Sequence, residues 1–82
     1  MEALVRRLIM YIVLEMQTNG ETTSLLSNTY ADKNVAENKY HTILAAASTS
    51  DVEIHSAAIM DEYGILLRSE YYQHEVEENT ES

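Results

Sequence analysis

Three histidines and several carboxylates are the residues of this chain whose types could do chemistry. His41 and His55 lie within the stretch KYHTILAAASTSDVEIHS, and His74 follows in SEYYQHE. Imidazole and carboxylate groups bind transition metals and exchange protons near neutral pH, provided that they converge on one point. The chain has no cysteine, which excludes disulfides, thiolate metal sites and cysteine nucleophiles. Whether the histidines converge depends on the elements that carry them.

A helix is predicted to carry His41. Asp32 is a good N-cap, and no glycine or proline follows it before Ser50. The helix should end near Thr49, because the serine and threonine residues there favour leaving a helix. At 3.6 residues per turn, one stripe of side chains must be buried and His41 lies on its flank. The members of this stripe are Ala36, Tyr40, Ile43, Leu44 and Ala47.

A hairpin is predicted before this helix. Residues 10–18 are rich in strand-forming types, and Asn19-Gly20 then gives the strongest short signal for a two-residue turn. This loop predicts two faces. The first pairs Thr18 with Glu21, Met16 with Thr23, Leu14 with Leu25 and Ile12 with Ser27, and the second pairs Glu15 with Ser24, Val13 with Leu26 and Tyr11 with Asn28. The first face is the more apolar, so we expect it to form the core.

A second hairpin is predicted to carry His55 and His74. Residues 52–60 alternate in polarity, residues 61–64 read as a type I turn with Gly64 in the left-handed region, and residues 65–75 follow as a strand. A four-residue loop places His55 directly opposite Glu70. A three-residue loop with a glycine bulge shifts the register by one and moves Arg68 and Glu70 to the other face. We favour the first register because it separates polar from apolar residues.

The order hairpin, helix, hairpin predicts an α+β fold of ββαββ type. The simplest fully antiparallel arrangement is a four-stranded sheet in the order 2-1-3-4, with the helix on one face. His41 and His55 then lie on opposite sides of the sheet, so no metal site forms from the three histidines of one subunit. His55 with Glu70 is left as the one candidate pair for binding or proton transfer, with His74 further along the same face.

The sheet face that the helix leaves uncovered is the predicted interface. Tyrosine suits such a surface because its ring is apolar and its hydroxyl still forms hydrogen bonds. We expect this face to mediate self-association, with partner or ligand binding and a simple exposed sheet as alternatives. The predicted interface residues are Tyr11, Val13, Leu26, His55, Ile59, Leu66, Arg68, Glu70, Tyr72 and His74.

Composition narrows the function classes. At 82 residues the chain forms one domain with a modest core, which disfavours a deep active site. The net charge is −9, so nucleic-acid phosphates would repel the chain. The acidic charge is then explained either by a basic protein partner or by solubility alone. There is no nucleophile elbow and no glycine-rich phosphate loop, since Gly20 and Gly64 lie in turns. We therefore expect neither enzymatic activity nor a cofactor.

The N-terminus MEALVRRLIMYIVLEM resembles the start of a signal peptide, but its apolar run ends at Glu15 without a small-residue cleavage site. The run is also far shorter than the roughly 20 residues that span a bilayer. We expect no membrane association, a single domain over residues 10–75, and a disordered acidic tail at residues 76–82.

Four stretches carry a resemblance to a known group of proteins: EMQTNG, YADKNVAENKYHTILAAASTS, VEIHSAAIMDEYG and SEYYQHE. Together they resemble small uncharacterised proteins encoded in phages and prophages of Gram-positive gut bacteria. The resemblance covers residues 10–75 and implies a phage origin, with residues 1–9 as an N-terminal extension, but it brings no known activity and no functional residues.

A phage origin with this composition predicts a small accessory protein that acts by binding. The favoured role is an inhibitor of a host defence component, located in the host cytoplasm and self-associating through its sheet. The alternative is a virion structural or assembly protein, for which a self-associating sheet is equally suitable. A weaker alternative is a small enzyme or nucleotide-binding protein that uses His55 and Glu70.

Overall fold

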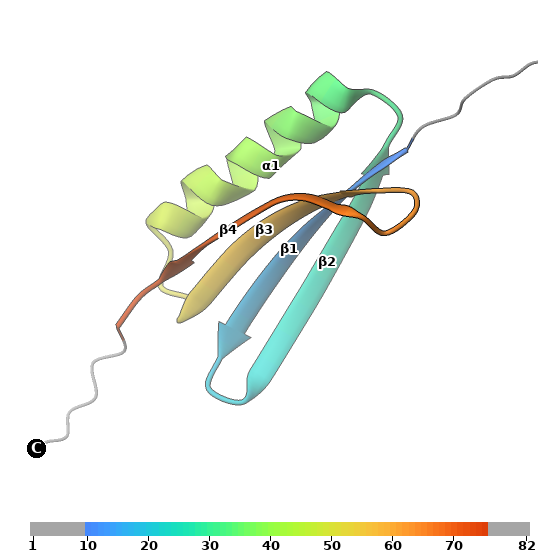
Figure 1. Cartoon of the computed structure of the whole chain (residues 1–82). Helices are drawn as coiled ribbons and strands as arrows, with labels where there is room; N and C mark the ends of the chain where they lie inside the picture. The colour runs from blue at the N-terminus through green and yellow to red at the C-terminus, as the bar shows by residue number, and fades with distance from the viewer. Residues whose placement is uncertain (1–9, 76–82) are drawn as a thin grey trace, which may run out of the picture.

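A computed structural model describes residues 10–75, and the predicted extension and tail lie outside them. Four strands and one helix follow in the order β1 (Tyr11–Asn19), β2 (Thr22–Tyr30), α1 (Lys33–Ser48), β3 (Ile54–Asp61) and β4 (Leu66–Gln73). The strands form one antiparallel sheet in the order β2-β1-β3-β4, and α1 lies on one side of it (Figure 1). The predicted α+β fold and strand order are confirmed.

The helix forms where its sequence predicts. The Asp32 carboxylate accepts hydrogen bonds from the backbone N–H groups of Asn34 and Val35, at 2.8 and 3.3 Å, and so satisfies two of the free donors of the first turn. Thr49 is the C-cap, and its N–H donates to the Ala46 carbonyl at 3.2 Å. The buried helix residues are Ala36, Tyr40, Ile43, Leu44 and Ala47, which is the predicted stripe.

The first hairpin turns one residue later than predicted. Asn19 pairs with Thr22, so the loop is Gly20-Glu21, with Gly20 at φ 59°. The register therefore moves by two residues, which keeps every side chain on its predicted face. Glu53, just before β3, accepts a hydrogen bond from the Gly20 N–H at 2.9 Å and donates its own N–H to the Asn19 side chain at 3.0 Å. These contacts tie the later turn to the neighbouring strand.

The second hairpin keeps its predicted turn but changes its register. Gly64 has φ 81° and donates its N–H to the Asp61 carbonyl at 3.0 Å. Opposite β4, the pairing shifts between Ile59 and Met60, so Met60 faces Leu66 and Ile59 faces Arg68. One additional residue, Leu67, is accommodated in this bulge. Neither predicted register is correct, although the favoured one assigned Ile59 and Arg68 to the same face, as observed.

The helix covers the opposite face from the one predicted. Its stripe packs on Val13 of β1 and on Ala57 and Ile59 of β3, which are buried, with Tyr11 and Tyr30 partly buried at the margin. The more apolar face, which includes Leu14 and Met16, is left open. The prediction ranked the two faces by the polarity of their individual residues. Polar residues on the covered face, however, form hydrogen bonds with one another, as described below, and can therefore be buried.

The core of the described residues is thin. Its fully buried hydrophobic positions come from β1, α1 and β3 alone, and three of them are alanines: Ala36, Ala47 and Ala57. In β2 every residue except Tyr30 is exposed, and every residue of β4 is exposed. Over residues 10–75, no helix has the length and apolar character needed to cross a membrane.

Candidate functional site

The predicted pair of His55 with Glu70 does not form. In the observed register His55 lies directly opposite Tyr72, and Glu70 lies opposite Ala57. The two residues share a sheet face, but the shift of the second hairpin separates them along the strands. The prediction was wrong because a slip of two residues preserves the faces, so the polarity pattern cannot distinguish the two registers.

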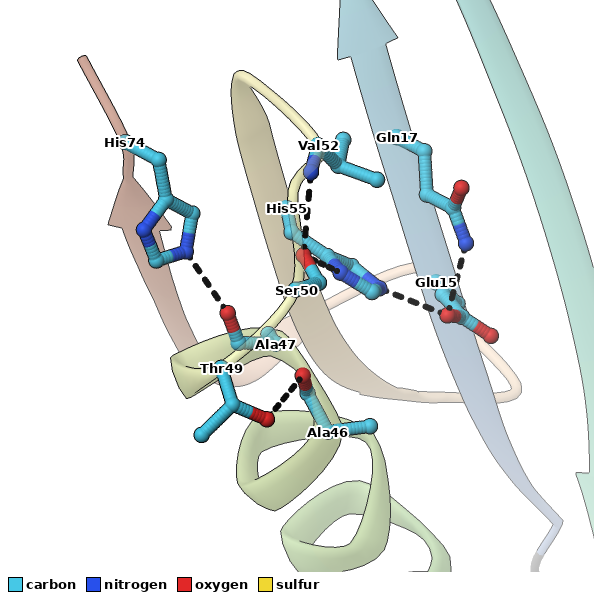
Figure 2. Close-up of polar contacts among 9 residues, drawn as sticks. All are labelled: Glu15, Gln17, Ala46, Ala47, Thr49, Ser50, Val52, His55 and His74. Carbon is cyan, nitrogen blue, oxygen red and sulfur yellow. Dashed lines mark hydrogen bonds and ion pairs between the residues drawn. The ribbon is translucent and has the colours of Figure 1, made fainter.

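His55 instead joins β3 to β1 and to the segment after the helix. Its Nε2 atom lies 2.7 Å from Oε2 of Glu15, and its Nδ1 atom lies 3.0 Å from Oγ of Ser50 (Figure 2). The residue is only 3% exposed. Glu15 and Ser50 are the members of this site that the sequence analysis missed.

The hydrogen bonds of this polar cluster, which we define as Glu15, Gln17, Ser50 and His55, form a consistent chain. The Val52 N–H donates to Ser50 Oγ at 3.2 Å, which leaves the hydroxyl proton free for His55 Nδ1. His55 Nε2–H then donates to Glu15, and Gln17 Nε2 donates to the same carboxylate oxygen at 3.0 Å. In this arrangement both ring nitrogens of the buried imidazole have partners, as burial requires.

The Glu15 carboxylate is held in its charged form. Burial alone would raise its pKa, but the hydrogen bonds from His55 and Gln17, together with the nearby positive charge of Lys39, outweigh burial and lower the pKa below its usual value. The cluster therefore keeps a negative charge at a partly buried position beside the core.

The order Ser50, His55, Glu15 matches the residue types of a hydrolase triad, but its surroundings favour a structural role. The imidazole is buried rather than presented to a substrate. Ser50 follows the C-terminus of α1, where its N–H bonds the Ala47 carbonyl at 3.3 Å. A helix C-terminus carries partial negative charge and would oppose an oxyanion. We interpret the cluster as a polar link between the two central strands and the end of the helix.

The other two histidines lie elsewhere. His74 donates through Nε2 to the Ala47 carbonyl at 2.8 Å (Figure 2). Its ring also stacks on Tyr72, with ring centroids 6.4 Å apart. His41 is exposed on α1, 3.6 Å from Glu37. Among residues 10–75 no three His, Asp or Glu side chains come together in a way that could hold a metal ion.

A second cluster surrounds Tyr40 on the helix side. Arg68 forms an ion pair with Glu37, and its guanidinium lies 4.9 Å from the centre of the Tyr40 ring. The Tyr40 hydroxyl is buried without a hydrogen-bond partner among the described residues. Burial, followed by the nearby charge of Glu70, raises the Tyr40 pKa, and Arg68 opposes this only in part.

The predicted interface does not form one open surface. Val13 and Ile59 are buried beneath α1, Tyr11 is partly buried, and Leu66 lies on the other face, opposite Met60. Leu26 remains on the helix side and is 58% exposed. The assignment failed because it placed the helix on the wrong face of the sheet.

Among residues 10–75, the strand residues on the uncovered face, here called the open face, include no charged side chain. Met16, Leu25, Leu66 and Tyr71 are its most exposed large side chains, with Tyr71 64% exposed. The central strands contribute Ile12, Leu14, Met16 and Thr18 from β1 and Ile54, Ser56, Ala58 and Met60 from β3. The outer strands contribute Thr23, Leu25, Ser27 and Thr29 from β2 and Leu66, Ser69, Tyr71 and Gln73 from β4.

The signal for Glu15 was available only in part. The order 2-1-3 places β1 beside β3, so a carboxylate in β1 must face some residue of β3. The pairing of those strands is set by contacts far apart in sequence, and no local motif gives its register. For Ser50 the helix-end signal was recognised, but its side chain also bonds His55 five residues later.

Comparison with known proteins adds no relative to this picture: no protein-family model, no curated protein and no solved structure matches the chain.

Proposed function

We propose that this protein acts by binding rather than by catalysis, and that its open face binds the open face of a second copy. The observation that carries this proposal is that the described strand residues on the open face include no charged side chain, in a chain whose net charge is −9. Interface cores are depleted in charged residues and enriched in methionine and tyrosine.

Electrostatics favours a copy of the chain seated on this particular surface. Two acidic molecules repel one another wherever their charged surfaces meet. Contact through the open faces directs the charged strand residues away from the contact, because they lie on the helix side: Glu15, Asp61, Arg68 and Glu70. A neutral face offers nothing to attract a basic partner, so a second copy fits it better.

The size of the open face suits a specific interface. Strands of this length, with a rise of about 3.4 Å per residue and a spacing of about 4.8 Å, give a face of about 28 by 19 Å. Two such faces would bury about 1,000 Å² in total even if they were flat, which is about the lower limit for a specific contact. Stacked sheets pack about 10 Å apart, and their side chains would form a second core.

The thin core supports the same conclusion. A chain of 82 residues buries a smaller fraction of its surface on folding than a larger domain does. Much of the buried core of this chain is also alanine, which contributes little apolar area. Burial of Leu14, Met16 and Met60 against a second copy would add the apolar contacts that a single helix does not supply.

Sedimentation equilibrium of the full-length protein tests the contact. Met16→Asp places a charge in the middle of the open face, and Val35→Asp is the control, since Val35 is 48% exposed on α1. We expect the first variant to weaken association by about 100-fold or more, because an unpaired charge would be buried, and the second to leave it unchanged. A monomeric wild-type protein, or equal effects of the two changes, would contradict the proposal.

The resemblance to phage proteins supplies the proposed setting. We propose that the assembled protein serves as an inhibitor of a host defence component in the host cytoplasm, with a virion component as the alternative. A tagged copy that retains one defence protein in a fixed ratio supports the first role. Detection of many copies in each purified virion supports the second.

A further inference from the structure

The outer edge of β2 lacks the features that usually prevent an edge strand from pairing with another strand. β2 has nine residues, TTSLLSNTY, none of which is charged, glycine or proline. Its pairing with β1 is regular from Thr22 to Tyr30. Natural proteins protect long edges with charges, prolines or bulges, because the free N–H and C=O groups of an edge bind other strands.

The opposite edge of the sheet shows such protection. β4 carries Arg68 and Glu70, and its pairing with β3 is interrupted by a bulge. Arg68 is also drawn over the sheet to Glu37 of α1. The two edges of one sheet therefore differ, and only the β2 edge is left unprotected among the described strands.

The hairpin register identifies the free backbone groups of β2. Asn19 and Thr22 flank a two-residue loop and so form a hydrogen-bonded pair, and such pairs recur at every second residue. Thr22, Ser24, Leu26, Asn28 and Tyr30 therefore direct their backbone groups toward β1. The alternate residues Thr23, Leu25, Ser27 and Thr29 direct theirs outward.

We propose that the β2 edge pairs with the β2 edge of a second copy, antiparallel and centred on Leu26, so that the two sheets become one. This centre uses the whole strand, since Thr22 then lies opposite Tyr30 of the other copy. The outward residues pair Thr23 with Thr29 and Leu25 with Ser27, so all of their N–H and C=O groups find partners. No charged side chain lies in the ladder.

The position of Leu26 supports a copy of the chain as the occupant. Leu26 is 58% exposed on the helix side, beyond the reach of the buried stripe of α1. In the proposed pairing the two Leu26 residues lie directly opposite in a pair without mutual hydrogen bonds, where side chains approach most closely. Each leucine would cover the other, which accounts for an apolar residue at this position.

This edge and the open face are different surfaces of the molecule, so the two contacts combine. If both form around two-fold axes that intersect at right angles, the wild-type protein is a tetramer of two layers. Met16→Asp should then still form a dimer through the β2 edge, and a variant blocked at the β2 edge should still form a dimer through the open face. Failure of one contact is thus distinguishable from failure of the other.

Residue-resolved amide hydrogen exchange of the full-length protein tests the edge. A free edge predicts alternation: the inward amides of β2 are protected and the outward ones exchange like unpaired amides. If the edge is paired, the amides of four more residues should also exchange slowly, by about 100-fold or more: Thr23, Leu25, Ser27 and Thr29. This additional protection should decrease when the protein is diluted. Strict alternation in the wild-type protein at concentrations where it associates would overturn the proposal.

Two variants sharpen this measurement. Ser27→Pro removes one outward N–H and should restore fast exchange at Thr23, Leu25 and Thr29, with the inward amides still protected. Ser27→Ala is its control and should change nothing, and Met16→Asp should leave the outward amides protected. If proline unfolds the hairpin, Leu26→Ser replaces it and should reduce the same protection; unchanged protection in Leu26→Ser would count against the proposed centre.

Discussion

His55 on β3 lies 2.7 Å from Glu15 on β1, although the two residues are 40 positions apart in sequence. They are diagonal neighbours across the sheet, because Gln17 is the residue directly opposite His55. Through Ser50, the same imidazole also reaches the end of the helix. One buried ring therefore connects β3, β1 and the segment after α1, which are distant from one another in the sequence or lie in different elements.

His55→Ala should destabilise the fold. The change leaves Glu15 partly buried without its main partner and opens a cavity, so we expect the free energy of unfolding to fall by about 2–3 kcal/mol. His41→Ala is the control, because His41 is exposed, and should cost less than about 0.5 kcal/mol. Urea unfolding at pH 7 measures both. Equal stability of the two variants would show that the link contributes little.

Stability should decrease in acid because of Glu15. Its pKa is lowered in the folded state from a usual value of 4.5, so the unfolded chain binds more protons as the pH falls. This contribution is fully present above about pH 4.5 and is lost as the pH falls through the folded pKa. Glu15→Gln should flatten the dependence of the unfolding free energy on pH below the usual pKa of 4.5. An unchanged slope would contradict the assignment.

Tyr40→Phe should stabilise the protein or leave it unchanged, unlike most core substitutions. The hydroxyl is buried without a partner, and its removal relieves a penalty of about 1 kcal/mol while the ring is kept. The pKa of Tyr40 is raised, so the folded state holds its proton longer and wild-type stability should fall above about pH 10. Thermal unfolding at pH 7 and pH 10.5 measures both effects. A loss of more than about 1 kcal/mol at pH 7 would show that the hydroxyl is satisfied.

Asp32→Ala should lower the free energy of unfolding by about 1 kcal/mol, because α1 loses its N-cap. The carboxylate accepts two backbone hydrogen bonds at the start of α1, and alanine accepts neither. Asp32→Asn is the control and should recover most of the loss, since its side-chain oxygen can cap in the same way. Chemical denaturation of the three proteins tests this, and a loss in Asp32→Asn as large as that in Asp32→Ala would point to charge instead of capping.

The helix was predictable from sequence because its determinants are local. Asp32 marks its start, Thr49 its end, and the stripe that includes Tyr40 and Ile43 follows from the helical period. The strand order was predictable as well, because a helix between two hairpins leaves few antiparallel arrangements.

The strand registers and the covered face were not predictable in the same way. Both hairpins move by about two residues, a change to which alternating polarity is insensitive. The choice of face depended on whether Glu15 and His55 satisfy one another, which only the β1–β3 pairing decides. The candidate site failed for the same reason, since His55 was assigned a partner on the neighbouring hairpin strand when its partner lies on β1.

Isotope-filtered NOE spectroscopy of a mixed sample tests the central claim most directly. One copy carries labelled methionine methyl groups, and the other copy is unlabelled. Contact through the open faces predicts intermolecular NOEs from the methyl groups of Met16 and Met60 to open-face residues such as Leu14. Intermolecular NOEs confined to the helix side, or no intermolecular NOEs from Met16 and Met60 in a sample that associates, would contradict it.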